Sequence, residues 1–144
     1  MVAFRDTTTI DASAIDVAAV LRDVERWPSW TSSMSQVTRG VSGPLTVGET
    51  VTVRQPRLMV ARWTVTVADI SGFVWTSTAP GMRSVAEHWV TENADGHTIV
   101  ALTFTMAGPL AWLAGAAYGR LIRRYLRMEA EGLRREAERR SASG

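Results

Sequence analysis

A long helical pattern at the C-terminal end is the feature that most constrains what this chain can fold into. After Gly108 and Pro109, apolar residues recur at spacings of three and four, as in a helix with one buried face. These residues are Leu110, Leu113, Ala114, Ala117, Leu121, Tyr125, Met128 and Leu133. We predict one helix longer than about 20 residues with a solvated, arginine-rich outer face, and its apolar face needs a surface to cover.

The segments before this helix alternate in polarity, which is typical of antiparallel strands with one wet face. Turn signals separate about five or six such strands. In the clearest one, residues 61–67, we expect Trp63, Val65 and Val67 to point inward. The inward residues of the next and the last strand are expected to be Phe73, Trp75 and Ser77, then Val100, Leu102, Phe104 and Met106.

The N-terminal region predicts a strand followed by two short helices. The run from Val2 to Ile10 is rich in β-branched and aromatic residues and fits an opening strand. Ser13 precedes Asp16 by three residues, a spacing typical of a helix start. Pro28 is tolerated only in a first helical turn or a bend, so a kink is expected there.

Length and composition indicate one globular domain. With 144 residues and 46% apolar residues, a single core is expected, with one domain over residues 1–140 and a frayed tail at 141–144. No targeting segment or apolar run of bilayer length is apparent, so we expect a cytoplasmic protein without stable membrane insertion. All 16 basic residues are arginine, which suggests a GC-rich bacterial genome.

Several classes of chemistry lack their usual residues. The chain has no cysteine, which excludes disulfides and thiolate nucleophiles. Phosphate-binding glycine loops, nucleophile elbows and zincin motifs are absent, and His88 and His97 are the only histidines. We therefore expect no metal and no cofactor. The net charge of only +2 argues against nucleic acid as a partner.

Several short motifs occur in a recognisable order. They are Ala12-Ser13-Ala14, the segment DVERWPSW at 23–30, GPLTVG at 43–48, Phe73-Val74-Trp75, Pro80-Gly81, His88 and Gly108-Pro109-Leu110. Together with the order of elements, they resemble the START-like (SRPBCC) superfamily and its polyketide cyclase/dehydrase family. The resemblance implies an α+β helix-grip fold, in which a curved antiparallel β-sheet wraps around a long C-terminal α-helix and two short helices follow the first strand.

The resemblance also implies an internal cavity for a hydrophobic small molecule, either a lipid or an aromatic, polyketide-like compound, with cyclase/dehydrase activity left open. The alternative is a non-catalytic protein-interaction module, such as a co-chaperone-like or toxin-like relative. A packed interior would favour that alternative. The sequence leaves a monomer and a homodimer equally open.

The inward aromatic and methionine side chains are the candidates for a pocket wall, although each one is also explained as filling the core. The expected ligand contacts are Trp30, Gln55, Met59, Trp63, Phe73, Trp75, His88, Phe104, Met106, Leu113, Ala117, Leu121 and Tyr125.

His88 and Tyr125 are the candidates for moving a proton. His88 is the titratable residue expected to face inward from a strand, where a pKa near ~6.5 would suit proton transfer. A histidine held by a backbone carbonyl is the simpler explanation. A register shift of one residue would place Trp89 inside and His88 outside.

Overall fold

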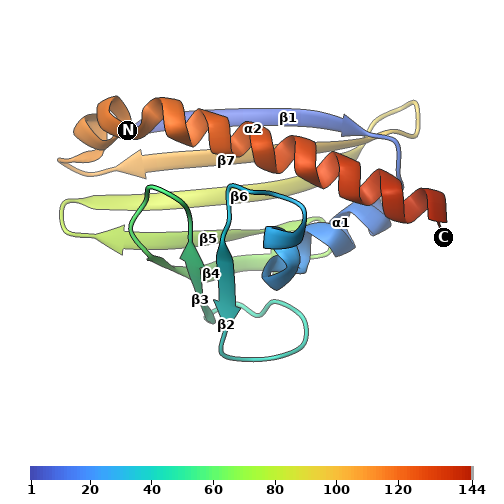
Figure 1. The fold of residues 1–144 in the computed structure, drawn as a ribbon, viewed down its shortest axis with the longest axis horizontal. Helices are drawn as coiled ribbons and strands as arrows, with labels where there is room; N and C mark the ends of the chain where they lie inside the picture. The colour runs from blue at the N-terminus through green and yellow to red at the C-terminus, as the bar shows by residue number, and fades with distance from the viewer. Residues whose placement is uncertain (144) are drawn as a thin grey trace.

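The computed structural model describes residues 1–143 and contains one sheet, two α-helices and a short 3-10 helix (Figure 1). All seven strands pair antiparallel in the order β1-β7-β6-β5-β4-β3-β2. The elements are β1 (Val2–Ile10), α1 (Ala14–Arg22), η1 (Val24–Ser29), β2 (Gln36–Arg39), β3 (Thr50–Arg54), β4 (Ala61–Asp69), β5 (Gly72–Ala79), β6 (Met82–Glu92), β7 (Thr98–Ala107) and α2 (Ala111–Ser143). The predicted α+β helix-grip architecture is confirmed.

The long helix α2 covers one part of the sheet. Figure 1 shows it running along β1 and β7, with α1 and η1 beside its C-terminal half. Its start is fixed at the β5–β6 turn, where the amide of Leu110 donates to the carbonyl of Gly81 at 3.0 Å. Gly108 has φ 110°, and a Cβ there would lie 2.6 Å from that same carbonyl oxygen. Glycine therefore allows the chain to turn from β7 into α2.

The predicted phase of α2 is wrong at several positions. Leu113 is 51% exposed and Ala117 is also exposed, while Leu121 is half-buried. The buried face instead consists of Ala111, Gly119, Ile122, Tyr125, Leu126, Glu129, Ala130, Gly132, Leu133 and Ala137. The prediction followed the large apolar residues, whereas the true face includes glycines and a glutamate.

Two glycines bring α2 close to its neighbours. At Gly119 a Cβ would make an ordinary contact of 3.6 Å with the ring of Phe4 in β1. At Gly132 a Cβ would collide with the backbone carbonyl oxygen of Trp30, which follows η1. The helix can pack this tightly against the segment after η1 only because residue 132 has no side chain.

A β-bulge in β4 changes which side chains of this strand point inward, so one of the three predicted positions is wrong. Trp63 and Val65 are buried as predicted, but Val67 is 40% exposed. The pairing with β5 shifts between Val65 and Val67, so Val65 lies opposite Trp75 and Val67 lies opposite Val74. The extra residue reverses the alternation beyond Val65.

The two short helices form as the sequence predicts. Ser13 caps α1 by accepting a hydrogen bond from the amide of Asp16 at 3.1 Å. Pro28 lies within η1, and the indole nitrogen of Trp27 donates to the carbonyl of Leu21 at 2.9 Å. This buried hydrogen bond anchors η1 on α1.

The C-terminal end of α2 includes Ser141, Ala142 and Ser143, and Gly144 lies outside the described residues. The frayed tail therefore stays a prediction. No helix among residues 1–143 combines the length and apolar character needed to cross a bilayer.

Gly132→Ala is expected to lower the free energy of unfolding by about 1–3 kcal/mol, because the new methyl group would push α2 away from Trp30. Gly119→Ala is the matched control on the same helix. Its methyl group fits beside Phe4, so it should raise the stability by roughly 0.5–1 kcal/mol through helix propensity. Urea unfolding monitored by circular dichroism measures both. Equal effects of the two substitutions would contradict the packing described for Gly132.

Candidate functional site

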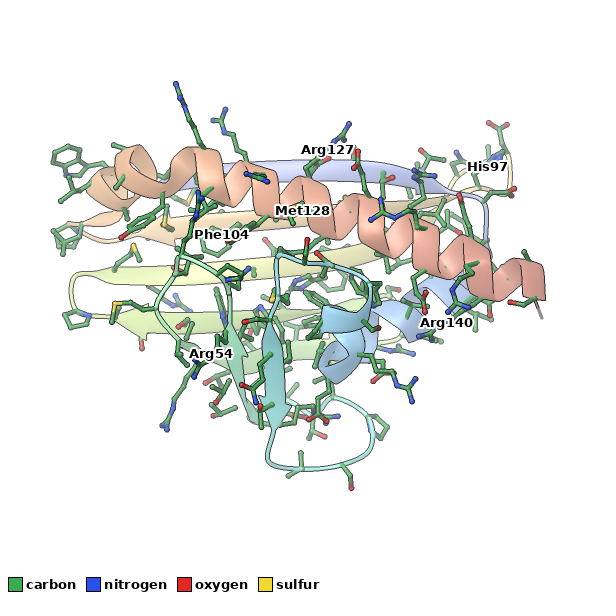
Figure 2. The ribbon with its side chains drawn as sticks, in the orientation of Figure 1. Arg54, His97, Phe104, Arg127, Met128 and Arg140 are labelled. Atoms are coloured by element: carbon green, nitrogen blue, oxygen red, sulfur yellow. The ribbon has the colours of Figure 1, made fainter. Side chains whose placement is uncertain are left out.

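A pocket of about 500 Å³ lies between the N-terminal half of α2 and the strands β4 to β7. The β3–β4 loop, residues 55–60, forms its remaining side. The lining residues are Gln55, Leu58, Met59, Val60, Ala61, Arg62, Trp63, Ser77, Thr78, Ala79, Met82, Ser84, Phe104, Met106, Ala114, Tyr118, Ile122, Tyr125 and Leu126. Figure 2 shows one of them, Phe104, on β7 below the helix.

The wall of this pocket is mainly apolar. Trp63 and Phe104 supply rigid rings that meet edge to face with centroids 5.9 Å apart. Met59, Met82 and Met106 add flexible side chains that can adapt to a ligand's shape. Hydroxyl and amide groups are spread among them, which is the composition of small-molecule sites.

The predicted ligand contacts divide into three groups. Those that line this pocket are Gln55, Met59, Trp63, Phe104, Met106 and Tyr125. Those that line a smaller neighbouring chamber are Trp75 and His88. Those that line neither space are Trp30, Phe73, Leu113, Ala117 and Leu121.

The five predicted contacts that line neither space are kept from them by packing or by the phase of α2. Phe73 is fully buried in the core, where its ring lies 5.0 Å from that of Trp75. Trp30 packs against Gly132, and its indole nitrogen is buried without a hydrogen-bond partner among residues 1–143. Leu113, Ala117 and Leu121 lie on the wrong side of α2, as the corrected helix phase explains.

The smaller chamber has a volume of about 40 Å³ and adjoins the pocket. Four residues line both spaces: Gln55, Trp63, Phe104 and Leu126. The remaining lining residues are Trp27, Met34, Trp75, Ala86, Glu87, His88, Leu102, Thr103 and Glu129. The chamber is therefore the inner neighbour of the pocket, enclosed by aromatic rings and by two buried titratable groups.

His88 faces inward from β6, in the register that the sequence favoured over Trp89. It is 4% exposed, and its Nδ1 lies 3.2 Å from the carbonyl oxygen of Phe73. Because a carbonyl only accepts, Nδ1 donates the hydrogen bond. Burial lowers the pKa of His88 to about 4, an effect that the hydrogen bond to Phe73 only partly offsets, so the ring is neutral at pH 7.

Glu129 is the functional candidate that sequence reasoning missed. It is 6% exposed on α2, and the hydroxyl of Ser33 donates to its Oε2 at 3.0 Å. Ser33 Oγ lies 2.8 Å from Thr31 Oγ1, so the carboxyl group is held by a buried hydroxyl pair. Burial raises the pKa of Glu129 to about 7, with the Ser33 hydrogen bond acting against this rise. Glu129 follows Leu126 by three residues and Ile122 by seven, and this helical spacing was the only sign in the sequence that it shares their buried face.

The hydroxyl group of Tyr125 is engaged rather than free. It donates a short hydrogen bond to the carbonyl oxygen of Pro56 in the β3–β4 loop. This contact joins α2 to the loop that closes the pocket. Tyr125 therefore acts in the structure as a tie between two walls.

No group of three or more metal-ligating side chains forms within residues 1–143. His97 lies in the β6–β7 turn, away from Phe104 in Figure 2. His88 is buried within β6, whereas His97 is exposed in the turn after that strand.

A family model described as "Polyketide cyclase / dehydrase and lipid transport" matches residues 1–138. The Zhui aromatase/cyclase from Streptomyces sp. R1128 is similar in structure, with TM-score 0.77, 19% identity, and coverage of 99% of this chain and 98% of that chain. A protein from Helicobacter pylori gives TM-score 0.80 at 10% identity, covering 94% of this chain and 88% of that chain.

The di-domain aromatase/cyclase StfQ from the steffimycin biosynthetic pathway gives TM-score 0.78 at 11% identity. The alignment covers 98% of this chain and 52% of that chain, as expected when one domain matches half of a di-domain protein. At these identities the likeness to solved structures shows the fold alone. A search of curated proteins gives no match.

The two buried groups predict a pH dependence of stability with opposite slopes. The folded state keeps the proton of Glu129 up to about pH 7, so its contribution to stability falls as pH rises above about 4.5. The folded state excludes a proton from His88 down to about pH 4, so its contribution falls as pH drops below about 6.5. Between about pH 4.5 and 6.5 the two slopes, each near 1.4 kcal/mol per pH unit, should cancel.

Glu129→Gln should therefore gain stability relative to the unmodified protein as pH rises from about 4.5 to 7, and His88→Asn should gain as pH falls from about 6.5 to 4. Urea unfolding at intervals of pH measures both differences. Glu131→Gln, a change at a partly exposed site on the same helix, is the control and should run parallel to the unmodified protein. A Glu129→Gln curve that also ran parallel would refute the assigned burial of this carboxyl group.

Proposed function

Because the chain belongs to the polyketide cyclase / dehydrase and lipid transport family, we propose that it encloses a hydrophobic small molecule in the pocket between α2 and the sheet. The ligand is a lipid or an aromatic, polyketide-like compound. The observation that carries this proposal is a pocket of about 500 Å³ with a mainly apolar wall. Sites for small molecules typically measure ~300–1,000 Å³.

The volume of the pocket supports ligand binding over the alternative of a protein-interaction module. A module that works through its surface has no need of an interior space, and empty apolar space costs stability because the lining atoms lose packing partners. Here the space lies beside Trp63, Phe104 and Met106, on the covered face of the sheet. Such a cost is easiest to explain if a ligand fills the pocket.

Entry to the pocket is expected through the β3–β4 loop. Met59 is 92% exposed and Val60 is 50% exposed, although both also line the pocket. The loop is held to α2 by the hydrogen bond from Tyr125 to Pro56. Breaking this hydrogen bond would remove one tie between the loop and the helix.

Binding is the primary activity in this proposal, and turnover is secondary. A cyclase would fold a reactive chain against the pocket wall and move protons with groups that reach it. Tyr125 is engaged with the loop, and His88 lines the chamber but not the larger pocket. The likeness to aromatase/cyclases is the observation that favours a cyclase reaction as the second candidate.

Binding can be measured with N-phenyl-1-naphthylamine, a neutral dye whose fluorescence rises in an apolar enclosure. The unmodified protein should bind it saturably, and its thermal stability should rise with dye concentration. Ala114→Phe fills the pocket from α2 and should weaken binding by more than about tenfold. Ala116→Phe, which adds the same ring at an exposed position two residues away, should bind like the unmodified protein.

Two results would contradict the proposal. One is the absence of saturable binding by the unmodified protein. The other is equal binding by the Ala114→Phe and Ala116→Phe variants, which would place the dye outside the pocket.

A further inference from the structure

Two buried titratable side chains meet at the chamber from opposite walls. His88 comes from β6 in the sheet, and Glu129 comes from α2. Both are more than nine-tenths buried, at 4% and 6% exposure. Polar groups are costly to bury, so their presence beside an apolar pocket requires an explanation.

The hydrogen bond of His88 determines what the ring offers to the chamber. Nδ1 carries the proton and donates it to the carbonyl of Phe73. The other nitrogen, Nε2, consequently bears a lone pair and acts as an acceptor. No hydrogen bond to Nε2 is formed within residues 1–143.

Glu129 offers the complementary group. Its Oε2 accepts from Ser33, while Oε1 has no hydrogen-bond partner in the described part of the chain. With the pKa of this carboxyl raised to about 7, it carries a proton at mildly acidic pH. The free oxygen can then donate a hydrogen bond. The hydroxyls of Ser33 and Thr31 fix the orientation of the group.

A third titratable residue lines the chamber but is otherwise engaged. Glu87 neighbours His88 on β6, and successive side chains of a strand point to opposite faces. Its Oε1 accepts a hydrogen bond from the indole nitrogen of Trp89 at 3.2 Å. Glu87 therefore does not compete with Glu129 for a group inside the chamber.

The size of the chamber limits what can enter it. Its volume of about 40 Å³ exceeds the ~10–15 Å³ that a cavity needs to hold one water molecule, and it is far below the about 500 Å³ of the pocket. The rings of Trp27, Trp63, Trp75 and Phe104 enclose it. The chamber has room for a small polar group of a ligand, and the larger pocket has room for the ring or chain that carries it.

We propose that this chamber is the polar subsite of the pocket, and that it selects an apolar ligand carrying one neutral hydroxyl group. The hydroxyl donates to Nε2 of His88 and accepts from the carboxyl of Glu129. A carboxylate is rejected from the chamber, because it would face a nitrogen lone pair there and lose its hydration in a space that no arginine lines. This inference rests on the proposed function, since the apolar body of the ligand occupies the larger pocket.

The test compares three probes that share one ring system: 2-naphthol, 2-methoxynaphthalene and 2-naphthoate. Binding is measured by calorimetry at pH 6, where Glu129 is protonated. The unmodified protein should bind 2-naphthol at least about tenfold more tightly than the methyl ether, and 2-naphthoate most weakly of the three.

Variants at Glu129 test whether the preference for 2-naphthol over its methyl ether arises in the chamber. Glu129→Leu should bring 2-naphthol to within about twofold of the ether, because the ligand oxygen then loses the carboxyl group as a hydrogen-bond partner. Glu129→Gln keeps a donor and an acceptor and should retain part of the preference. Glu131→Gln is the control and should bind as the unmodified protein does. Circular dichroism melting establishes that each variant is folded.

The outcomes separate this inference from the proposed function. If all three probes bind with equal affinity, the polar subsite is refuted while enclosure of apolar molecules stands. A hydroxyl preference that survives Glu129→Leu also refutes the subsite. If no probe binds and N-phenyl-1-naphthylamine does not bind either, the proposed function itself fails.

Discussion

The close approach of α2 to β1 and to the segment after η1 is the constraint on which the rest of the structure depends. Gly119 packs on Phe4 of β1, and Gly132 packs on the backbone of Trp30. Seven strands about 4.8 Å apart span roughly 30 Å, whereas a helix with its side chains is only about 10 Å wide. A helix held at β1 and β7 cannot cover β4 and β5, so space remains beside those strands.

The protein fills only part of that space with its own side chains. Trp27, from η1, packs against Trp75 and His88 with ring centroids 5.8 and 5.4 Å away, and this cluster closes one end. Elsewhere the β3–β4 loop lines the pocket and is tied to α2 through Tyr125. The two ends of the pocket therefore differ, with aromatic rings at one and the β3–β4 loop at the other. The two buried titratable groups, His88 and Glu129, lie at the aromatic end, where little of either side chain is exposed to water.

Much of this arrangement follows from the sequence, and the failures have identifiable causes. Strand alternation correctly placed Trp63, Phe104 and Met106 on the covered face, because each lies in a regular stretch of strand. It failed at Val67, where a bulge shifts the register. The phase of α2 could not be predicted from apolar residues alone, since Glu129 is buried by contacts with Ser33 that no local pattern reveals.

The central claim is that an apolar molecule lies between α2 and the sheet, and the methionines allow a direct test of it. Nuclear Overhauser effects from bound N-phenyl-1-naphthylamine to methionine methyl groups report which surface the dye touches. The account predicts contacts to Met82 and Met106, which line the pocket, and none to the 92% exposed Met1. Contacts to Met1 without any to Met106 would contradict it.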